Sequence, residues 1–212
     1  MRDQIEALAE AAGLFIAGEV AEDGGTVVLL AAGAGFWPLL QAAPEFAGAD
    51  PVDLYSTRIV NDMAGRLGAE AIFPFGGPPY APFIRWAQES GRAWQSPVGM
   101  LIHDTAGLMI SYRGALRFQE VLEPAGTLPS MPCTICAGQP CLGACPVDAL
   151  SKESGYDVAA CHAYLDTPDG TSCLTQGCVA RRACPVSHQF GRDPAQSAHH
   201  MASFHPKKAE HA

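Results

Sequence analysis

Cysteine is absent from residues 1–132 of this 212-residue chain, and all eight cysteines lie between positions 133 and 184. An ordinary cytosolic chain scatters its cysteines along the sequence. This concentration therefore predicts that the C-terminal third is a chemical unit of its own.

Long hydrophobic runs are also absent. No window is apolar over a length that would span a bilayer, and residues 1–13, "MRDQIEALAEAAG", lack the apolar core of a signal peptide. We therefore expect a cytoplasmic protein that is not inserted in a membrane. With 48% hydrophobic and 17% charged residues, the composition is that of a folded chain rather than a disordered one.

Positive charge is scarce. Residues 1–130 carry 7 Lys+Arg and 15 Asp+Glu, a net charge of −8, and residues 131–212 carry 6 and 7, a net charge of −1. Nucleic-acid binding requires a basic stripe that this sequence does not contain, so we expect no nucleic-acid partner. The acidic balance is consistent with solubility or with steering of a basic partner protein.

The pattern of residues 1–122 predicts an α/β (α+β) domain. Helices are expected over 1–13, 52–67 and 81–90, and a buried strand over "TVVLLA", 26–31. Residues 69–75 predict another strand, and 98–119 predict two or three antiparallel strands. Residues 123–132, with three prolines and a glycine, predict a linker, and residues 133–212 predict a small helical domain of short loops and short helices.

The eight cysteines form two groups, each ending in Cys-Pro. The first is Cys133-x2-Cys136-x4-Cys141-x3-Cys145-Pro146, and the second is Cys161 followed by Cys173-x4-Cys178-x5-Cys184-Pro185. A disulfide framework suits small secreted domains, which does not match the cytoplasmic expectation. Two zinc sites would usually show paired C-x2-C knuckles, although spacing alone leaves zinc open. The c-type haem motif C-x-x-C-H is missing, because Ala137 follows Cys136.

Eight thiolates are the number that two 4Fe–4S clusters need, and the bacterial two-cluster ferredoxin pattern sends its Cys-Pro ligand to the other cluster. Reciprocal pairing of this kind predicts two ligand sets. The first cluster is expected on Cys133, Cys136, Cys141 and Cys184, and the second on Cys145, Cys161, Cys173 and Cys178. In this pattern each proline begins the helix that leaves its cysteine.

The order of these cysteines, with "CHAYLDT" (161–167) and the tail "PAQSAHHMASF" (194–204), resembles the iron–sulfur domain of epoxyqueuosine reductases and related reductive dehalogenases. Upstream, "SPVGMLIHDTAGLMISYRGALRF" (96–118) is similar to a segment of epoxyqueuosine reductases and of the cobalamin-processing decyanase family. The resemblance implies a nitroreductase-like or cobalamin-processing-like fold for the N-terminal domain and a ferredoxin-type C-terminal domain.

Three classes of function compete. The reductases place a proton-donating aspartate before the matching hairpin, whereas this chain has no carboxylate between Gly91 and Met100. We therefore expect an electron carrier with two 4Fe–4S clusters and a redox partner protein, and no catalytic residue. The alternative is a reductase whose N-terminal domain binds a corrinoid or flavin fed by the clusters. A third class is a structural or regulatory iron–sulfur protein.

Single histidines carry weaker signals. His103 lies between two expected strands, where a turn histidine is the simpler interpretation and an axial ligand or acid–base group the alternative. His162 follows an expected ligand and is a candidate for a hydrogen bond that tunes the cluster. His199, His200 and His205 are expected on a solvated helix face.

Overall fold

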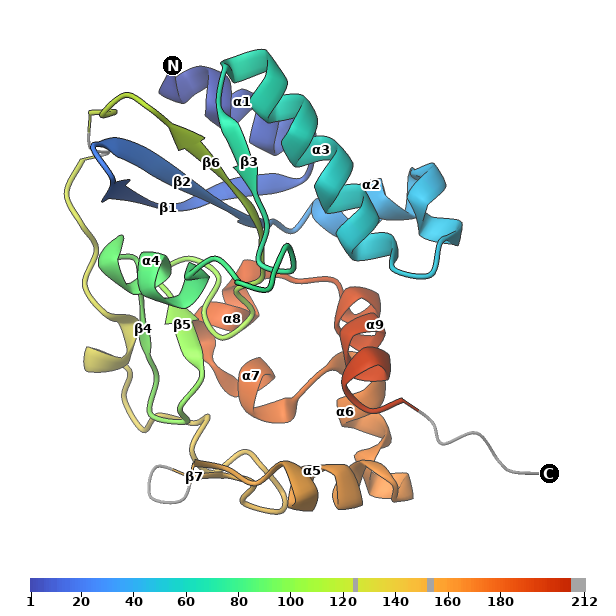
Figure 1. Cartoon of the computed structure of the whole chain (residues 1–212). Helices are drawn as coiled ribbons and strands as arrows, with labels where there is room; N and C mark the ends of the chain where they lie inside the picture. The colour runs from blue at the N-terminus through green and yellow to red at the C-terminus, as the bar shows by residue number, and fades with distance from the viewer. Residues whose placement is uncertain (124–125, 152–154, 207–212) are drawn as a thin grey trace. The chain divides into compact units, whose positions relative to one another are not determined.

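The computed structural model describes residues 1–123, 126–151 and 155–206, and the chain is mixed α/β. It divides into two compact units (Figure 1). Unit 1 comprises Met1–Trp94 and Ile110–Met131, and unit 2 comprises Gln95–Met109 and Pro132–Ala212. The boundary differs from the expected one, because residues 95–109 group with the cysteine-rich part of the chain.

Unit 1 is built on a four-stranded antiparallel sheet with strand order β1-β2-β6-β3. Its strands are β1 (Leu14–Glu22), β2 (Gly25–Ala32), β3 (Glu70–Ile72) and β6 (Tyr112–Phe118). Every residue of β2 is buried, which confirms the buried strand predicted over 26–31. The strand predicted over 69–75 is present but shorter.

Helices supply the remaining core of unit 1: α1 (Arg2–Ala11), α2 (Phe36–Ala42), α3 (Pro51–Leu67) and α4 (Phe83–Glu89), with a 3-10 turn, η1, at Pro44–Ala47. The predicted helices over 1–13, 52–67 and 81–90 are therefore confirmed. Pro51 occupies the first turn of α3, where no amide donor is needed, and Gly68 ends the helix in the left-handed conformation at φ 66°.

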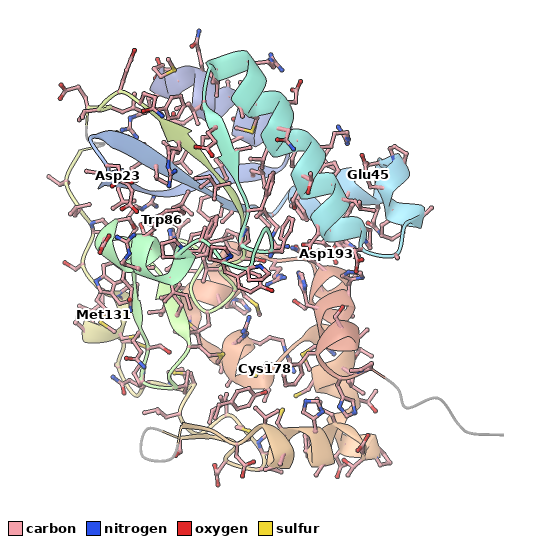
Figure 2. The ribbon with its side chains drawn as sticks, in the orientation of Figure 1. Asp23, Glu45, Trp86, Met131, Cys178 and Asp193 are labelled. Carbon is pink, nitrogen blue, oxygen red and sulfur yellow. The ribbon has the colours of Figure 1, made fainter. Side chains whose placement is uncertain are left out.

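The two faces of β2 are buried by different elements. Val28, Leu30 and Ala32 pack in one cluster with side chains of α1, α2 and α3. The opposite face of the sheet is approached by α4, which contacts β1 and carries the buried Trp86 (Figure 2). A strand that is covered on both sides reads as a continuous apolar run, which is why the sequence signal for β2 is strong.

The strands predicted over 98–119 do not pair with each other, which corrects the expected hairpin. β5 (Leu101–His103) pairs with β4 (Ala93–Gln95), whereas β6 lies between β2 and β3. His103 instead bridges to Gly107 in a tight turn. Apolar runs alone do not identify their partner strands, because period-2 patterns are alike in neighbouring and separated strands.

Strand β1 was not predicted. Its pairing with β2 shifts register between Ile16 and Gly18, and Gly18 has φ 154° and lies against Ser90. Such a bulge interrupts the alternation of apolar and polar residues on which a sequence-based strand assignment depends.

Unit 2 consists of short elements around the cysteines. Besides the β5 segment, it contains a small sheet, β7 (Leu150–Ser151) and β8 (Gly155–Tyr156), and 3-10 turns η2 (Pro132–Thr134) and η3 (Pro168–Gly170). Its helices are α5 (Val158–Leu165), α6 (Thr171–Gln176), α7 (Val179–Ala183), α8 (Pro185–Phe190) and α9 (Pro194–Phe204). Within the described part of the chain, no helix has the length and apolar character needed to cross a bilayer.

Candidate functional site

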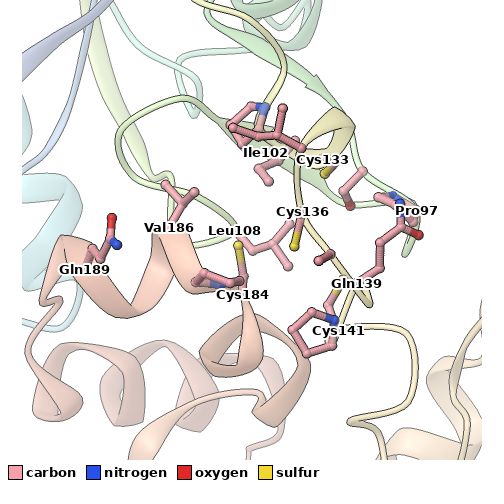
Figure 3. A pocket seen from close by; sticks show the side chains of 16 residues that line it. Pro97, Ile102, Leu108, Cys133, Cys136, Gln139, Cys141, Cys184, Val186 and Gln189 are labelled. Atoms are coloured by element: carbon pink, nitrogen blue, oxygen red, sulfur yellow. The ribbon is translucent and has the colours of Figure 1, made fainter.

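Four of the cysteines in unit 2 surround one pocket. Cys133 lies in η2, Cys136 and Cys141 lie in the loop that follows, and Cys184 precedes Pro185, the first residue of α8. Figure 3 shows these four side chains around the pocket. Cys133 and Cys184 are 51 positions apart in the sequence, so folding rather than chain proximity brings the fourth thiol to the other three.

The pocket has a volume of about 300 Å³. A single buried water requires only about 10–15 Å³ on a comparable measure, so the space suits a group of many atoms. Its other walls are mostly apolar and include Ile102, Leu108 and Val186. Among the described residues that line it, none is an aspartate, glutamate, lysine, arginine or histidine.

The thiols of this first group influence one another electrostatically. Burial raises the pKa of Cys133, and Cys141, Cys184 and Cys136 raise it further. The pKa of Cys141 is likewise raised by burial and then by Cys184 and Cys136. Like charges disfavour each other only at short range, so these shifts reflect the proximity of the four sulfur atoms.

The other four cysteines form a second group. Cys145 lies in a turn, Cys161 on α5 and Cys173 on α6. Cys178, which is labelled in Figure 2, lies at the N-terminus of α7. Burial raises the pKa of Cys161, a hydrogen bond from Tyr156 lowers it, and Cys178, Cys145 and Cys173 raise it. Here too, the thiols that raise the pKa of one cysteine are the other members of its group.

Reciprocal pairing assigns these same two sets of cysteines to two clusters, and that ligand assignment stays a prediction. All eight cysteines are free thiols in the structure. Across residues 1–123, 126–151 and 155–206, no three His, Cys, Asp or Glu side chains converge closely enough to hold a single metal ion. The four thiols of the first group therefore line a cavity and do not converge on the position of a single ion.

One detail of the expected pattern is wrong. Cys184-Pro185 begins a helix, α8, but Cys145-Pro146 does not. After Cys145 the chain makes a turn, closed by the Asp148 amide donating to the Cys145 carbonyl at 3.2 Å, and continues into β7. Asp148 has φ 48°, a conformation that a helix does not use, so the proline marks a turn there.

The segment after β5 holds α8, and with it Cys184, in position. The amide of Leu108 donates to Ser187 Oγ at 2.8 Å, and Arg192 donates to the carbonyl of Met109 at 3.2 Å. Gly107 has φ 57° and packs directly against Ser187. These contacts explain why residues 95–109 belong to unit 2.

We expect Ser187→Ala to lower the free energy of unfolding by about 1–2 kcal/mol, because the buried Leu108 amide would lose its acceptor. Chemical denaturation of the full chain, without added iron, measures this change. Ser203→Ala is the matched control, since the Ser203 hydroxyl is exposed on α9 and donates to His199. Equal stabilities of the two variants would contradict a role for Ser187 in holding the β5 segment.

The end of α9 packs beside the second group. Phe204 stacks on Tyr156 with ring centroids 6.2 Å apart, and it contacts the ring of His162 at 4.7 Å. His205 Nδ1 lies 2.8 Å from His162 Nδ1, and His205 Nε2 lies 2.9 Å from Asp166 Oδ1. His205 is therefore part of a hydrogen-bonded group, which corrects its expected place on a solvated face. His162 directs Nδ1 to His205.

His103 is fully buried, and its Nδ1 accepts hydrogen bonds from the amides of Thr105 (3.1 Å) and Ala106 (3.3 Å). This arrangement is that of a turn histidine. His103 does not line the pocket of the first cysteine group.

Two side chains near the cysteines were not identified from the sequence. Ser96 lines the pocket of the first group and is 5% exposed, and its hydroxyl has no hydrogen-bond partner among the described residues. Tyr156 donates a hydrogen bond to Cys161 in the second group. A lone serine or tyrosine has no spacing signal, so only the fold reveals these positions.

No protein-family model matches this chain, and neither does any curated protein or solved structure.

Proposed function

We propose that this chain is an electron-transfer protein whose unit 2 holds two 4Fe–4S clusters. The supporting observation is the gathering of eight free thiols into two groups of four, each drawn from segments distant in the sequence. Cys133, Cys136, Cys141 and Cys184 hold one cluster, and Cys145, Cys161, Cys173 and Cys178 hold the other. A bound 4Fe–4S cluster supplies a one-electron carrier.

The donor set and the space fit this group. A single tetrahedral ion with metal–sulfur bonds near 2.3 Å requires sulfur atoms about 3.8 Å apart, whereas a cubane occupies the middle of the site and keeps its ligands farther apart. The first cysteine group encloses a cavity of about 300 Å³ with uncharged walls. Low polarity around the thiols also limits access of water.

The cysteine order that resembles epoxyqueuosine reductases and reductive dehalogenases supports the same proposal for unit 2. For unit 1, the resemblance suggests a nitroreductase-like or cobalamin-processing-like domain that docks a redox partner protein in the cytoplasm. The stretch between Gly91 and Met100 carries no carboxylate, and His103 is engaged in a turn. A carrier is therefore favoured over a corrinoid- or flavin-dependent reductase.

Metal and sulfide analysis of the anaerobically prepared full chain tests the proposal. We expect about eight irons and eight sulfides per chain, the content of two cubanes, with no stoichiometric zinc. The control is the same protein treated with a chelator, which should lose its visible absorption. Two zincs without iron would contradict the proposal. Eight irons with a saturable response to added cobalamin or flavin would instead favour the reductase.

A further inference from the structure

Each cysteine group has a side-chain hydroxyl beside it that comes from outside its cysteine loops: Ser96 lines the pocket of the first group, and Tyr156 lies beside Cys161 in the second. We propose that Ser96 and Tyr156 donate hydrogen bonds to the sulfur atoms of the first and second cluster sites, respectively, and that each raises the reduction potential of its own site. This inference rests on the proposed function, because it assigns a role toward the clusters to two residues that are not ligands.

The evidence for Ser96 is its buried, unpaired hydroxyl. A buried hydroxyl without a partner is unfavourable by about 1–3 kcal/mol, so native proteins pair nearly all such groups. Ser96 is 5% exposed, it lines the pocket that the four thiols surround, and no described residue accepts from its Oγ. The acceptors that line that pocket are the sulfur atoms of the four cysteines and the side-chain amides of Gln139 and Gln189, and no described residue accepts from the hydroxyl.

The position of Ser96 is fixed by its backbone. Its amide donates to the carbonyl of Met100 at 2.9 Å, and its carbonyl accepts from the amide of Gly99 at 2.9 Å. These two bonds close the turn between β4 and β5. The segment that follows β5 is held to α8 by the hydrogen bond between Leu108 and Ser187. Ser96 is therefore connected through β5 to the helix that begins after Cys184.

The evidence for Tyr156 is the place of its ring beside the second group, where it stacks on Phe204 and its hydroxyl acts on the Cys161 thiol. Its hydroxyl donates to the Cys161 thiol, which lowers the pKa of that thiol. The near-parallel stacking of Phe204 on the ring, at an interplanar angle of 17°, and the pairing of β8 with β7 hold the tyrosine in this orientation.

The effect on potential follows from charge. Each electron added to a cluster site increases the negative charge on its sulfur atoms, and no bond is broken. An O–H directed at one of these sulfurs therefore stabilises the reduced form more than the oxidised form. Removing the hydroxyl lowers the reduction potential of that site.

The test is an electrochemical titration of the full-length, anaerobically prepared protein, followed by electron paramagnetic resonance of the two reduced sites. Ser96→Ala and Tyr156→Phe should each shift a different one of the two transitions to lower potential. The expected shift is about tenfold in the ratio of oxidised to reduced protein at a fixed poise, which corresponds to about 59 mV for one electron. Iron content should stay at the wild-type value.

Matched controls separate this role from packing. Tyr164→Phe removes a hydroxyl from the helix of Cys161, but that hydroxyl donates to the backbone carbonyl of Asp169 at 2.8 Å. Ser90→Ala removes an equally buried hydroxyl, which donates to the carbonyl of Ala87 at 2.7 Å. Neither control should shift a transition, and Ser96→Thr, which keeps the hydroxyl, should retain the wild-type potential.

The outcomes are distinguishable. Two unshifted transitions in Ser96→Ala and Tyr156→Phe, with full iron content, would overturn the inference and leave the proposed function standing. Shifts of the same transition by both variants would also overturn it. Iron-free wild-type protein would instead refute the proposed function itself.

Discussion

Replacing Cys133 and Cys184 together with serine should remove about half of the iron, whereas replacing Cys141 and Cys145 together should remove nearly all of it. The first pair lies in one group although it is separated by 51 positions, so one complete set of four thiols remains. The second pair lies four positions apart but in different groups, so neither set remains complete. A 4Fe–4S cluster needs four thiolates.

Iron and sulfide content of the anaerobically prepared variants measures this difference, with helical circular dichroism to show that each variant is folded. Ala137→Ser is the matched control, because it adds a hydroxyl to the same exposed loop without removing a thiol. If instead the pair Cys133/Cys184 lost all iron and the pair Cys141/Cys145 kept half, the ligands would be grouped by sequence position. Loss of all iron with an unfolded chain in both would contradict independent sites.

Gly107→Ala should lower the free energy of unfolding by about 2–5 kcal/mol. A non-glycine residue in the left-handed region costs about 1–2 kcal/mol, and overpacking a filled site typically adds about 1–3 kcal/mol. Gly107 has φ 57°, and an alanine methyl would overlap the backbone nitrogen of Ser187 and come within 2.6 Å of its hydroxyl oxygen. The backbone of α8 would have to move, and Cys184 with it.

Gly99→Ala separates the two contributions. Gly99 also has a left-handed φ, 77°, and lies in the turn before β5, but no atom lies within 4 Å of an added methyl. Gly99→Ala should lower the free energy of unfolding only by the cost of the left-handed backbone, about 1–2 kcal/mol. Denaturation midpoints of both variants measure the difference. Equal losses would mean that the close approach of the β5 segment to α8 does not contribute to stability.

The features predicted best from the sequence are those with a local cause. β2 is covered on both faces and reads as an unbroken apolar run, and α3 has a proline at its start and a glycine at its end. The assignment of the cysteines to two ligand sets rests on a pattern as well, the two Cys-Pro pairs, and it stays a prediction. The mixed α/β class follows from such elements.

The features that were missed depend on contacts between distant residues. β1 carries a bulge at Gly18, β6 pairs with strands far away in the chain, and residues 95–109 join unit 2 through Leu108 and Ser187. Ser96 is recognisable only by its burial beside the thiols. No local pattern encodes a pairing of this kind, since many sequences could make the same contact.

The chain enters unit 2 at Gln95, returns to unit 1 at Ile110 and enters unit 2 again at Pro132. Cleavage of the chain at one position therefore cannot separate the whole cysteine-rich unit from unit 1. A fragment beginning at Pro132 would keep all eight thiols but would lack Ser96, Ile102 and Leu108, which form one wall of the first pocket. During synthesis these three residues leave the ribosome before any of the cysteines, and the first site is complete only once the later helix α8 has packed against the segment that carries them.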